Sequence, residues 1–175
     1  VAYGIIMYTG FIFSGTYIGY SLGSAPVISY HYGAGNKKEL KSLFKHSIIL
    51  LVISSVIMTL LAEVLAKYLA GIFVSYDKQL LELTTTAIRI YSVSYLISEL
   101  NIFASSFFTA LNNGFVSAAI SFLRMFLFQI IMILLLPVII GINGIWIAVT
   151  AAESLALVVS VVFVIINRKK YGYMI

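Results

Sequence analysis

The sequence predicts an all-α membrane protein, a polytopic bundle of transmembrane helices. Hydrophobic residues make up 62% of the 175 residues and charged residues only 10%, and the mean hydropathy is +1.08. A soluble domain is about 45–50% apolar and about 25% charged. So few charges could not cover the surface of a water-soluble globule, and they also exclude a disordered chain. The apolar runs lack the two-residue alternation of barrel strands, which favours helices over a β-barrel.

Five segments are long and apolar enough for transmembrane helices, each of which needs roughly 20 residues. The predicted spans are residues 2–30, 47–74, 83–111, 115–140 and 145–166, the second of them strongly apolar to residue 62 and amphipathic beyond it. Short segments that carry Gly, Asn or charges separate the spans at residues 33–38, 75–78, 112–114 and 141–144. Gly and Asn are common at helix ends and turns. We therefore expect one transmembrane unit over residues 1–175 and no soluble domain.

The first predicted span is rich in small residues. Gly15, Gly19 and Gly23 recur every four residues, so they share one helix face. Such a face allows a neighbouring helix to approach closely, and a flexible hinge is the alternative. Pro26 lies near the end of the span and removes one backbone donor. It is expected to kink the helix, either as fixed packing or as a moving joint.

The basic residues predict how the spans are oriented. Seven of the eleven Lys and Arg residues lie beside the first break or in the tail: Lys37, Lys38, Lys41, Lys45, Arg168, Lys169 and Lys170. Positive charge concentrates on the cytoplasmic side of membrane proteins, and five spans place both groups on one side. We expect a multi-pass protein of the cell membrane with a cytoplasmic C-terminus. The chain then starts outside, at Val1, which indicates a truncated piece of a longer protein.

Four polar residues are predicted at similar depths in the last three spans. Glu99, Arg124, Gln129 and Glu153 lie roughly 15–23 Å from the helix ends on the C-terminal side of the membrane, at a rise of about 1.5 Å per residue. That is near the middle of a hydrocarbon core about 30 Å thick, where such groups point away from lipid. Glu153 could pair with Arg124 or bond Gln129, which would link the last two helices. A functional site instead needs a carboxyl without a fixed cation.

Glu99 has no evident partner in the sequence and is the first candidate for a functional carboxyl. A carboxyl in an apolar pocket could exchange a proton or, when ionised, bind a cationic substrate. Tyr95 is one of several aromatic residues on the same span that could hold a flat cation, although ordinary packing explains most of them. The predicted substrate or ion site therefore comprises Glu99, Tyr95, Gln129 and Glu153.

Three further charges of the apolar segments have simpler interpretations. Glu63 and Lys67 are four residues apart near the outer end of the second span, so we expect them to pair on one helix face. Arg89 lies in the first turns of the third span and is expected to anchor it at the surface.

The sequence carries none of the usual signatures of an enzyme. Cys is absent, so disulfides and thiol nucleophiles are excluded, and the two His residues, His31 and His46, form a poor metal site. There is no Ser/His/Asp set with catalytic spacing and no phosphate-binding loop. The net charge of +5 comes from the connecting segments, so it predicts topology rather than nucleic-acid binding. We expect no cofactor beyond a coupling ion.

Three motifs resemble those of multidrug and toxic compound extrusion (MATE) transporters. Residues 23–36 resemble the signature near the inner end of the family's eighth helix. Residues 107–114, followed by Ser117, Ser121 and Arg124, resemble the junction of the tenth and eleventh helices. Residues 141–146, with Glu153 beyond them, resemble the start of the twelfth. The likeness covers the whole chain in order, with Ala25 where the first motif usually has Gln and His31 where it often has Asn.

The resemblance implies helices eight to twelve of twelve, most of a C-terminal lobe that lacks its first helix and the N-terminal lobe of the same chain. It implies an antiporter that exports amphipathic, often cationic compounds in exchange for Na⁺ or H⁺ by alternating access. Glu99 does not align clearly with the acidic coupling residue of some members' tenth helix. The residues expected to act in structure or gating are Gly15, Gly19, Gly23, Pro26, Gly33, Asn36 and Arg124.

The expected partners are an amphipathic small molecule and membrane lipids, and no nucleic acid. Three alternatives stay open at this point. The protein could be a lipid-linked oligosaccharide flippase of the same superfamily, whose cavity should be basic. It could be a membrane scaffold that transports nothing, with all its buried polar groups paired. The piece could also be inactive by itself.

Overall fold

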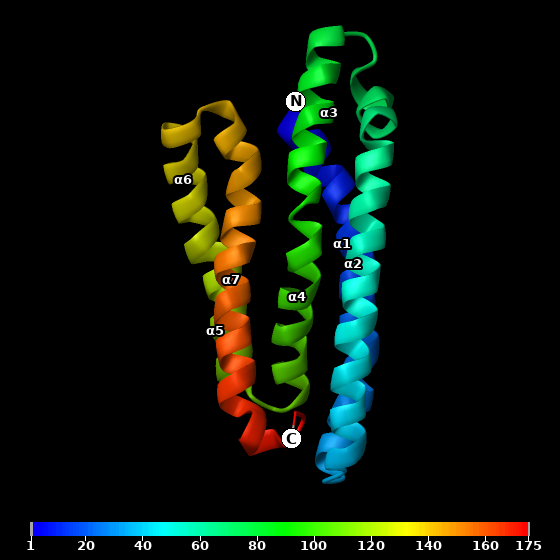
Figure 1. The fold of residues 1–175 in the computed structure, drawn as a ribbon, viewed down its shortest axis with the longest axis vertical. Helices are drawn as coiled ribbons and strands as arrows, with labels where there is room; N and C mark the ends of the chain where they lie inside the picture. Colours follow the sequence, from blue (N-terminus) through cyan, green and yellow to red (C-terminus); the bar gives the residue numbers. More distant parts are fainter. Residues whose placement is uncertain (1, 175) are drawn as a thin grey trace.

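The computed structural model describes residues 2–174 as a bundle of long helices packed along a common direction (Figure 1). Every regular element in this range is helical, so the predicted all-α class is confirmed. The five predicted segments appear in order. They are α1 (Ala2–Gly33), α2 (Lys37–Val74), α3 (Lys78–Ser92) with α4 (Tyr95–Ala110), α5 (Gly114–Phe122) with α6 (Gln129–Ile140), and α7 (Ile142–Tyr171).

Three helices of the described chain are both long and apolar enough to cross a membrane: Lys37–Val74, Gly114–Ile140 and Ile142–Tyr171. The 32 residues of α1 are long enough, but Gly, Tyr, Ser and Thr dilute its aliphatic residues. The third segment is divided into α3 and α4. In the turn between them Ser94 N–H donates to the Tyr91 carbonyl and Leu96 N–H to the Val93 carbonyl. These shorter steps tighten the helix without reversing the chain.

Asn36 sets the start of α2, ten residues ahead of the predicted apolar span. Its side-chain oxygen accepts a hydrogen bond from the Glu39 backbone N–H at 3.1 Å, which caps the helix. The preceding Gly35 has φ +67°, a conformation that glycine adopts freely. The basic residues of the first break therefore extend α2 as a helix instead of lying in a loop.

A π-helix joins α5 to α6 within the predicted fourth span. It comprises Leu123–Phe128, and α6 continues from Gln129 to Ile140. A π-helix bonds each residue to the fifth along instead of the fourth, so it changes the direction of the side chains that follow. Arg124 lies within this segment.

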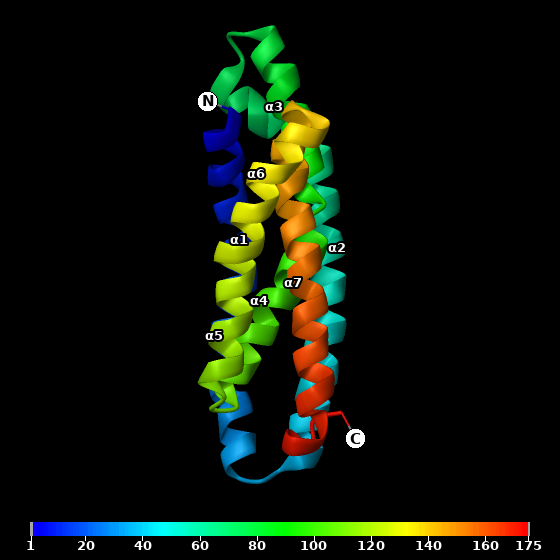
Figure 2. The same ribbon diagram turned by 90° about the vertical axis from the view of Figure 1, so that its left-hand side faces the viewer.

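The helix α4 lies at the centre of the bundle, in contact with α1, α2, α5 and α7. Figure 2 shows α5 and α6 in front of α4, with α7 beside them. Aromatic residues fill the end of the bundle where the chain terminates, with Phe103, Phe107 and Phe108 of α4 buried there. Polar side chains on α4 are therefore surrounded on several sides, and this arrangement shapes the candidate site.

The C-terminal residues fold back into this aromatic core. Tyr173 is buried, and its ring centroid lies 5.0 Å from those of both Phe44 and Phe107. Its hydroxyl donates to the Val164 carbonyl at 2.7 Å. Burial raises the pKa of the Tyr173 phenol, and Tyr171 beside it adds to the increase. Gly172, at φ +74°, makes the turn that allows this return.

Candidate functional site

Two buried polar side chains of α4 point to opposite sides of the helix. Glu99 and Asn101 are 2% and 0% exposed. Two residues advance an α-helix by roughly 200°, so neighbours of one side chain are out of reach of the other. Glu99 faces α2, and Asn101 faces α7. The central layer predicted from depth therefore contains two separate polar groups.

The first group joins α4, the π-helix and α7. The Nε of Arg124 donates to both carboxylate oxygens of Glu153, at 2.8 and 3.0 Å. Asn101 Nδ2 donates to Glu153 Oε2 at 2.8 Å and to the Glu153 carbonyl at 2.9 Å. Ser160 Oγ completes the group by donating to Asn101 Oδ1 at 2.9 Å. Both carboxylate oxygens of Glu153 thus have hydrogen-bond partners, and Arg124 balances its charge. This is the pairing with Arg124 that the sequence offered as one alternative.

The second group surrounds Glu99, between α1, α2 and α4. Ser54 Oγ donates to Glu99 Oε1. The other oxygen, Oε2, is buried and has no hydrogen-bond partner in the described chain. The two ion pairs among residues 2–174 involve other carboxylates. The Tyr17 hydroxyl of α1 is also buried without a hydrogen-bond partner in the described chain. Glu99 is therefore the buried acid that this part of the chain leaves without a cation.

Aromatic rings lie beside this second group, toward the start of α4. Tyr95 lies four residues before Glu99, on the same face of α4, and is 4% exposed. Its ring stacks on Phe13 with a centroid distance of 5.1 Å and meets the edges of Tyr17 and Tyr91 at 6.4 and 5.8 Å. These rings pack on one another, and a role of Tyr95 in holding a flat cation beside Glu99 stays a prediction.

A polar cleft of about 300 Å³ opens on the other side of α4, between α1, α4 and α5. Arg124 lines it together with hydroxyl residues of three helices: Ser21, Ser105, Ser106, Thr109 and Ser121. The hydroxyls bond one another, with Ser105 Oγ 2.7 Å from Ser121 Oγ. Ser106 Oγ donates to the Ser21 carbonyl at 3.1 Å. The hydroxyls of the cleft can therefore exchange hydrogen bonds with a polar molecule. The cleft itself carries no strong net charge.

The remaining predicted site residues lie apart from both groups. Gln129 is half-buried at the start of α6, and the described chain shows no bond between it and Glu153. Asn36 caps α2, and Gly33 is the last residue of α1. The helix α1 continues through Pro26. The stripe of Gly15, Gly19 and Gly23 is exposed, with no described atom within 4 Å of an added Cβ, so no helix of residues 2–174 packs on it.

The predicted pair of Glu63 and Lys67 is not formed. Glu63 Oε2 instead lies 3.8 Å from Arg89 Nε, and Ser92 Oγ donates to Glu63 Oε1 at 2.8 Å. Because α2 and α3 pack side by side, the neighbouring helix offers Glu63 a closer cation than its own helix does. Arg89 is thus a partner between helices as well as a surface residue.

Sequence reasoning missed two residues that define the polar groups, Ser54 and Asn101. Each is a small polar residue within an apolar run, a weak signal because such residues often bond their own helix backbone. The polar cleft corresponds to a clearer pattern in the sequence. Ser117, Ser121 and Arg124 are spaced four and three apart on one helix, and Ser105 and Thr109 are spaced four apart on another. Matching polar faces of this kind predict adjacent helices.

Comparison with known proteins links the chain to one family and one fold. A model of the MatE family matches residues 2–135. The fold matches the bent form of the Vibrio cholerae MATE transporter VcmN, with a TM-score of 0.89, 18% identity and 99% of this chain covered. It also matches an inward-facing multidrug resistance MATE family transporter of the MOP superfamily, with a TM-score of 0.85, 17% identity and 97% covered. The chain spans 39% of each of these two structures. No curated protein matches.

Proposed function

The chain belongs to the MatE family, and from this premise we propose that it is the C-terminal transport lobe of an ion-coupled antiporter. Its family and fold support a multi-pass membrane protein. In our proposal it exports amphipathic, mainly cationic compounds in exchange for Na⁺ or H⁺. The exchange proceeds by alternating access, with this lobe moving against a second lobe around a site near the middle of the membrane.

The observation that carries the proposal is the unpaired oxygen of Glu99. An ionised carboxylate in an apolar interior is expensive unless a cation or several donors compensate it. Glu99 receives one hydrogen bond, from Ser54, and no ion pair within residues 2–174. A proton or a bound Na⁺ would remove the imbalance. Loading and unloading of this carboxyl would then favour different conformations of the lobe, which is what ion coupling requires.

The different hydrogen-bond partners of Glu99 and Glu153 separate the roles of these two central acids. Glu153 is held by Arg124 and Asn101, so binding a coupling ion there would require breaking two existing contacts. We assign Glu153 and Arg124 to holding α7 against the π-helix. Glu99 is the ion-binding candidate, with Tyr95 on the same face of α4 and Tyr17 packed against the Tyr95 ring.

The polar cleft is the proposed path of the substrate. Its hydroxyls give weak, adaptable hydrogen bonds, and its aliphatic residues, such as Ile18 and Leu22, give apolar contact. Both kinds of contact suit amphipathic molecules. The cleft also favours an exporter over the rival flippase. Arg124 is its basic residue and is already neutralised by Glu153, whereas an anionic headgroup would need a free cation.

The experiment is ion-driven efflux in proteoliposomes with the complete protein and its Glu99→Gln variant. Glutamine keeps the shape and the Ser54 contact but cannot be ionised. Coupling between two ligands of one protein is commonly worth about 5–150-fold in affinity, so we expect a loss of ion-driven efflux on that scale. The matched control is Glu82→Gln, the same change at an exposed position of α3, which should transport normally.

Unchanged ion dependence in Glu99→Gln would remove Glu99 from the mechanism. Substrate type is tested separately with the unmodified protein. Export of a lipid-linked oligosaccharide, without export of amphipathic cations, would replace the antiporter with the flippase. Absence of any transport by the complete, folded protein would favour a scaffold.

A further inference from the structure

We propose that a crevice between α2, α4 and α7, on the side of α4 away from the polar cleft, binds one acyl chain of an anionic phospholipid. Its phosphate would be held by Lys37, Lys41 and Arg168 at the end of the bundle where the chain terminates. This site is separate from the proposed transport path. It concerns the lipid around the protein, and it does not depend on which compound is transported.

The crevice has a volume of about 310 Å³ and an apolar lining. Its walls include Phe44 and Ile48 of α2, Leu100 of α4, and Leu157 and Val161 of α7. The hydroxyl of its polar member, Ser160, is already used to bond Asn101. Val161 is 46% exposed, so the crevice opens to the surface. It therefore offers no hydrogen bond to an occupant and suits a hydrocarbon.

The chemistry of the crevice favours a lipid tail as its occupant. Its accessible lining is apolar, and a lipid tail has no side chains or backbone polar groups to accommodate.

Three cations lie on the helix faces that form the crevice, beyond its end. On α2, Lys37 and Lys41 precede Phe44 and Ile48 at intervals of four, three and four residues, so all four share one face. On α7, Arg168 follows Val161 by seven residues and Ile165 by three, again on one face. Three residues rise about 4.5 Å. The cations are thus about one helical turn beyond the apolar walls, the spacing between a lipid tail and its phosphate.

The three cations are available to a ligand. Lys37, Lys41 and Arg168 are exposed, and the ion pairs of the described chain involve other residues. The nearby acid along the sequence is Glu39, whose carboxylate is in neither of these ion pairs. Basic clusters at a membrane surface attract anionic lipids. The positive charge of these residues therefore suits an anionic headgroup, and the apolar crevice suits its acyl tail.

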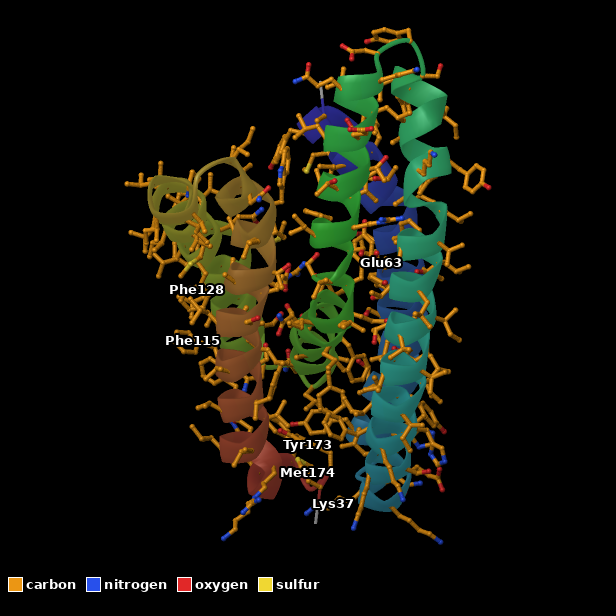
Figure 3. All side chains as sticks on the ribbon, turned by 45° about the horizontal axis from the view of Figure 1, so that its top comes forward. Lys37, Glu63, Phe115, Phe128, Tyr173 and Met174 are labelled. Atoms are coloured by element: carbon orange, nitrogen blue, oxygen red, sulfur yellow. The ribbon has the colours of Figure 1, made fainter. Side chains whose placement is uncertain are left out.

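The C-terminal residues contact both the apolar crevice and the cation Lys37. Met174 lines the crevice, and Tyr173 before it packs on Phe44 in the adjoining core. Gly172 lies against Lys37, because a Cβ added there would be 2.9 Å from the Lys37 Cδ. Figure 3 shows Tyr173, Met174 and Lys37 gathered at the same end of the bundle. The tail of the chain therefore closes the crevice beside the cations.

The test is photocrosslinking in the complete protein, reconstituted in mixed vesicles of phosphatidylglycerol and phosphatidylcholine. A diazirine amino acid is placed at Leu157, inside the crevice, or at Val158, which is 63% exposed on the same helix. The protein is solubilised and washed with detergent before illumination, and adducts are identified by mass spectrometry. We expect retained lipid at Leu157, enriched in phosphatidylglycerol by roughly threefold or more over the vesicles, and little at Val158.

Charge variants test the headgroup contact. The double change Lys41→Gln and Arg168→Gln should return the adducts at Leu157 to the vesicle ratio. The matched change Lys67→Gln and Lys78→Gln, at the opposite end of α2 and the start of α3, should leave the enrichment unchanged. All four positions are exposed, so folding should be preserved. A peptide adduct at Leu157 in place of lipid, an unenriched lipid, or equal adducts at Val158 would overturn the proposal.

Discussion

Glu99 and Glu153 are chemically identical side chains to which the fold gives different neighbours. Glu153 has a guanidinium and an amide as hydrogen-bond donors, whereas Glu99 has one serine hydroxyl. A buried charge that is paired and bonded is tolerated in the interior, and one that is not favours a proton or a cation. The assignment of one acid to structure and the other to coupling depends on this difference.

Breaking the Arg124–Glu153 pair should destabilise the protein more than removing it. Arg124→Ala leaves a buried carboxylate with Asn101 as its remaining side-chain partner, a change that typically costs about 3–5 kcal/mol. We expect a clear fall in Tm in detergent. The double variant Arg124→Leu with Glu153→Leu should recover most of the loss, because no uncompensated charge remains. Equal Tm values for the single variant and the unmodified protein would show that the pair contributes little.

At the scale of the elements, α6 and α7 form a close hairpin around a two-glycine turn. Gly141 has φ +69° and ends α6, and Gly144 begins the return along it. A Cβ added at Gly144 would overlap the Leu136 carbonyl and lie 2.7 Å from the Pro137 nitrogen. These atoms belong to the backbone and cannot move aside cheaply. The motif of residues 141–146 therefore has a packing role here: it lets the two helices touch.

Gly144→Ala should therefore weaken this hairpin. Overpacking of this kind typically costs about 1–3 kcal/mol, measured as a lower Tm of the purified protein. Gly71→Ala is the matched change in α2, where an added Cβ meets nothing within 4 Å. There the better helix propensity of Ala should leave stability unchanged or raised by up to about 1 kcal/mol. Similar Tm shifts for both variants would contradict the packing role.

At the scale of the whole molecule, α1 has one face on the bundle and one that points away. Tyr17 is buried, and Gly19, two residues later, lies on roughly the opposite side of the helix. The glycine stripe is thus directed outward from residues 2–174, with nothing described within 4 Å. The predicted close packing stays a prediction. If it occurs, the partner is a part of the protein beyond this chain, or a second copy.

Gly19→Leu tests that prediction in the complete protein. A neighbour packed on the stripe would collide with the leucine, so we expect a lower Tm and reduced transport. Gly71→Leu places the same side chain on α2, at a position that also has open space around it. This variant should retain both the Tm and the transport rate. An unchanged Tm and rate for Gly19→Leu would indicate that the stripe faces lipid or water.

The sequence by itself determined the helical class and the family resemblance, and it predicts the spans and the depth of the central polar residues. These depend on hydropathy and on distance along a helix, which are local properties of the chain. Only the tertiary structure decided which residues each polar side chain contacts. It separated Glu99 from Asn101 and gave Glu63 to Arg89 rather than Lys67. The reason is that rise along a helix follows from residue number alone, whereas the neighbour that a side chain meets depends on how whole helices rotate and pack against one another.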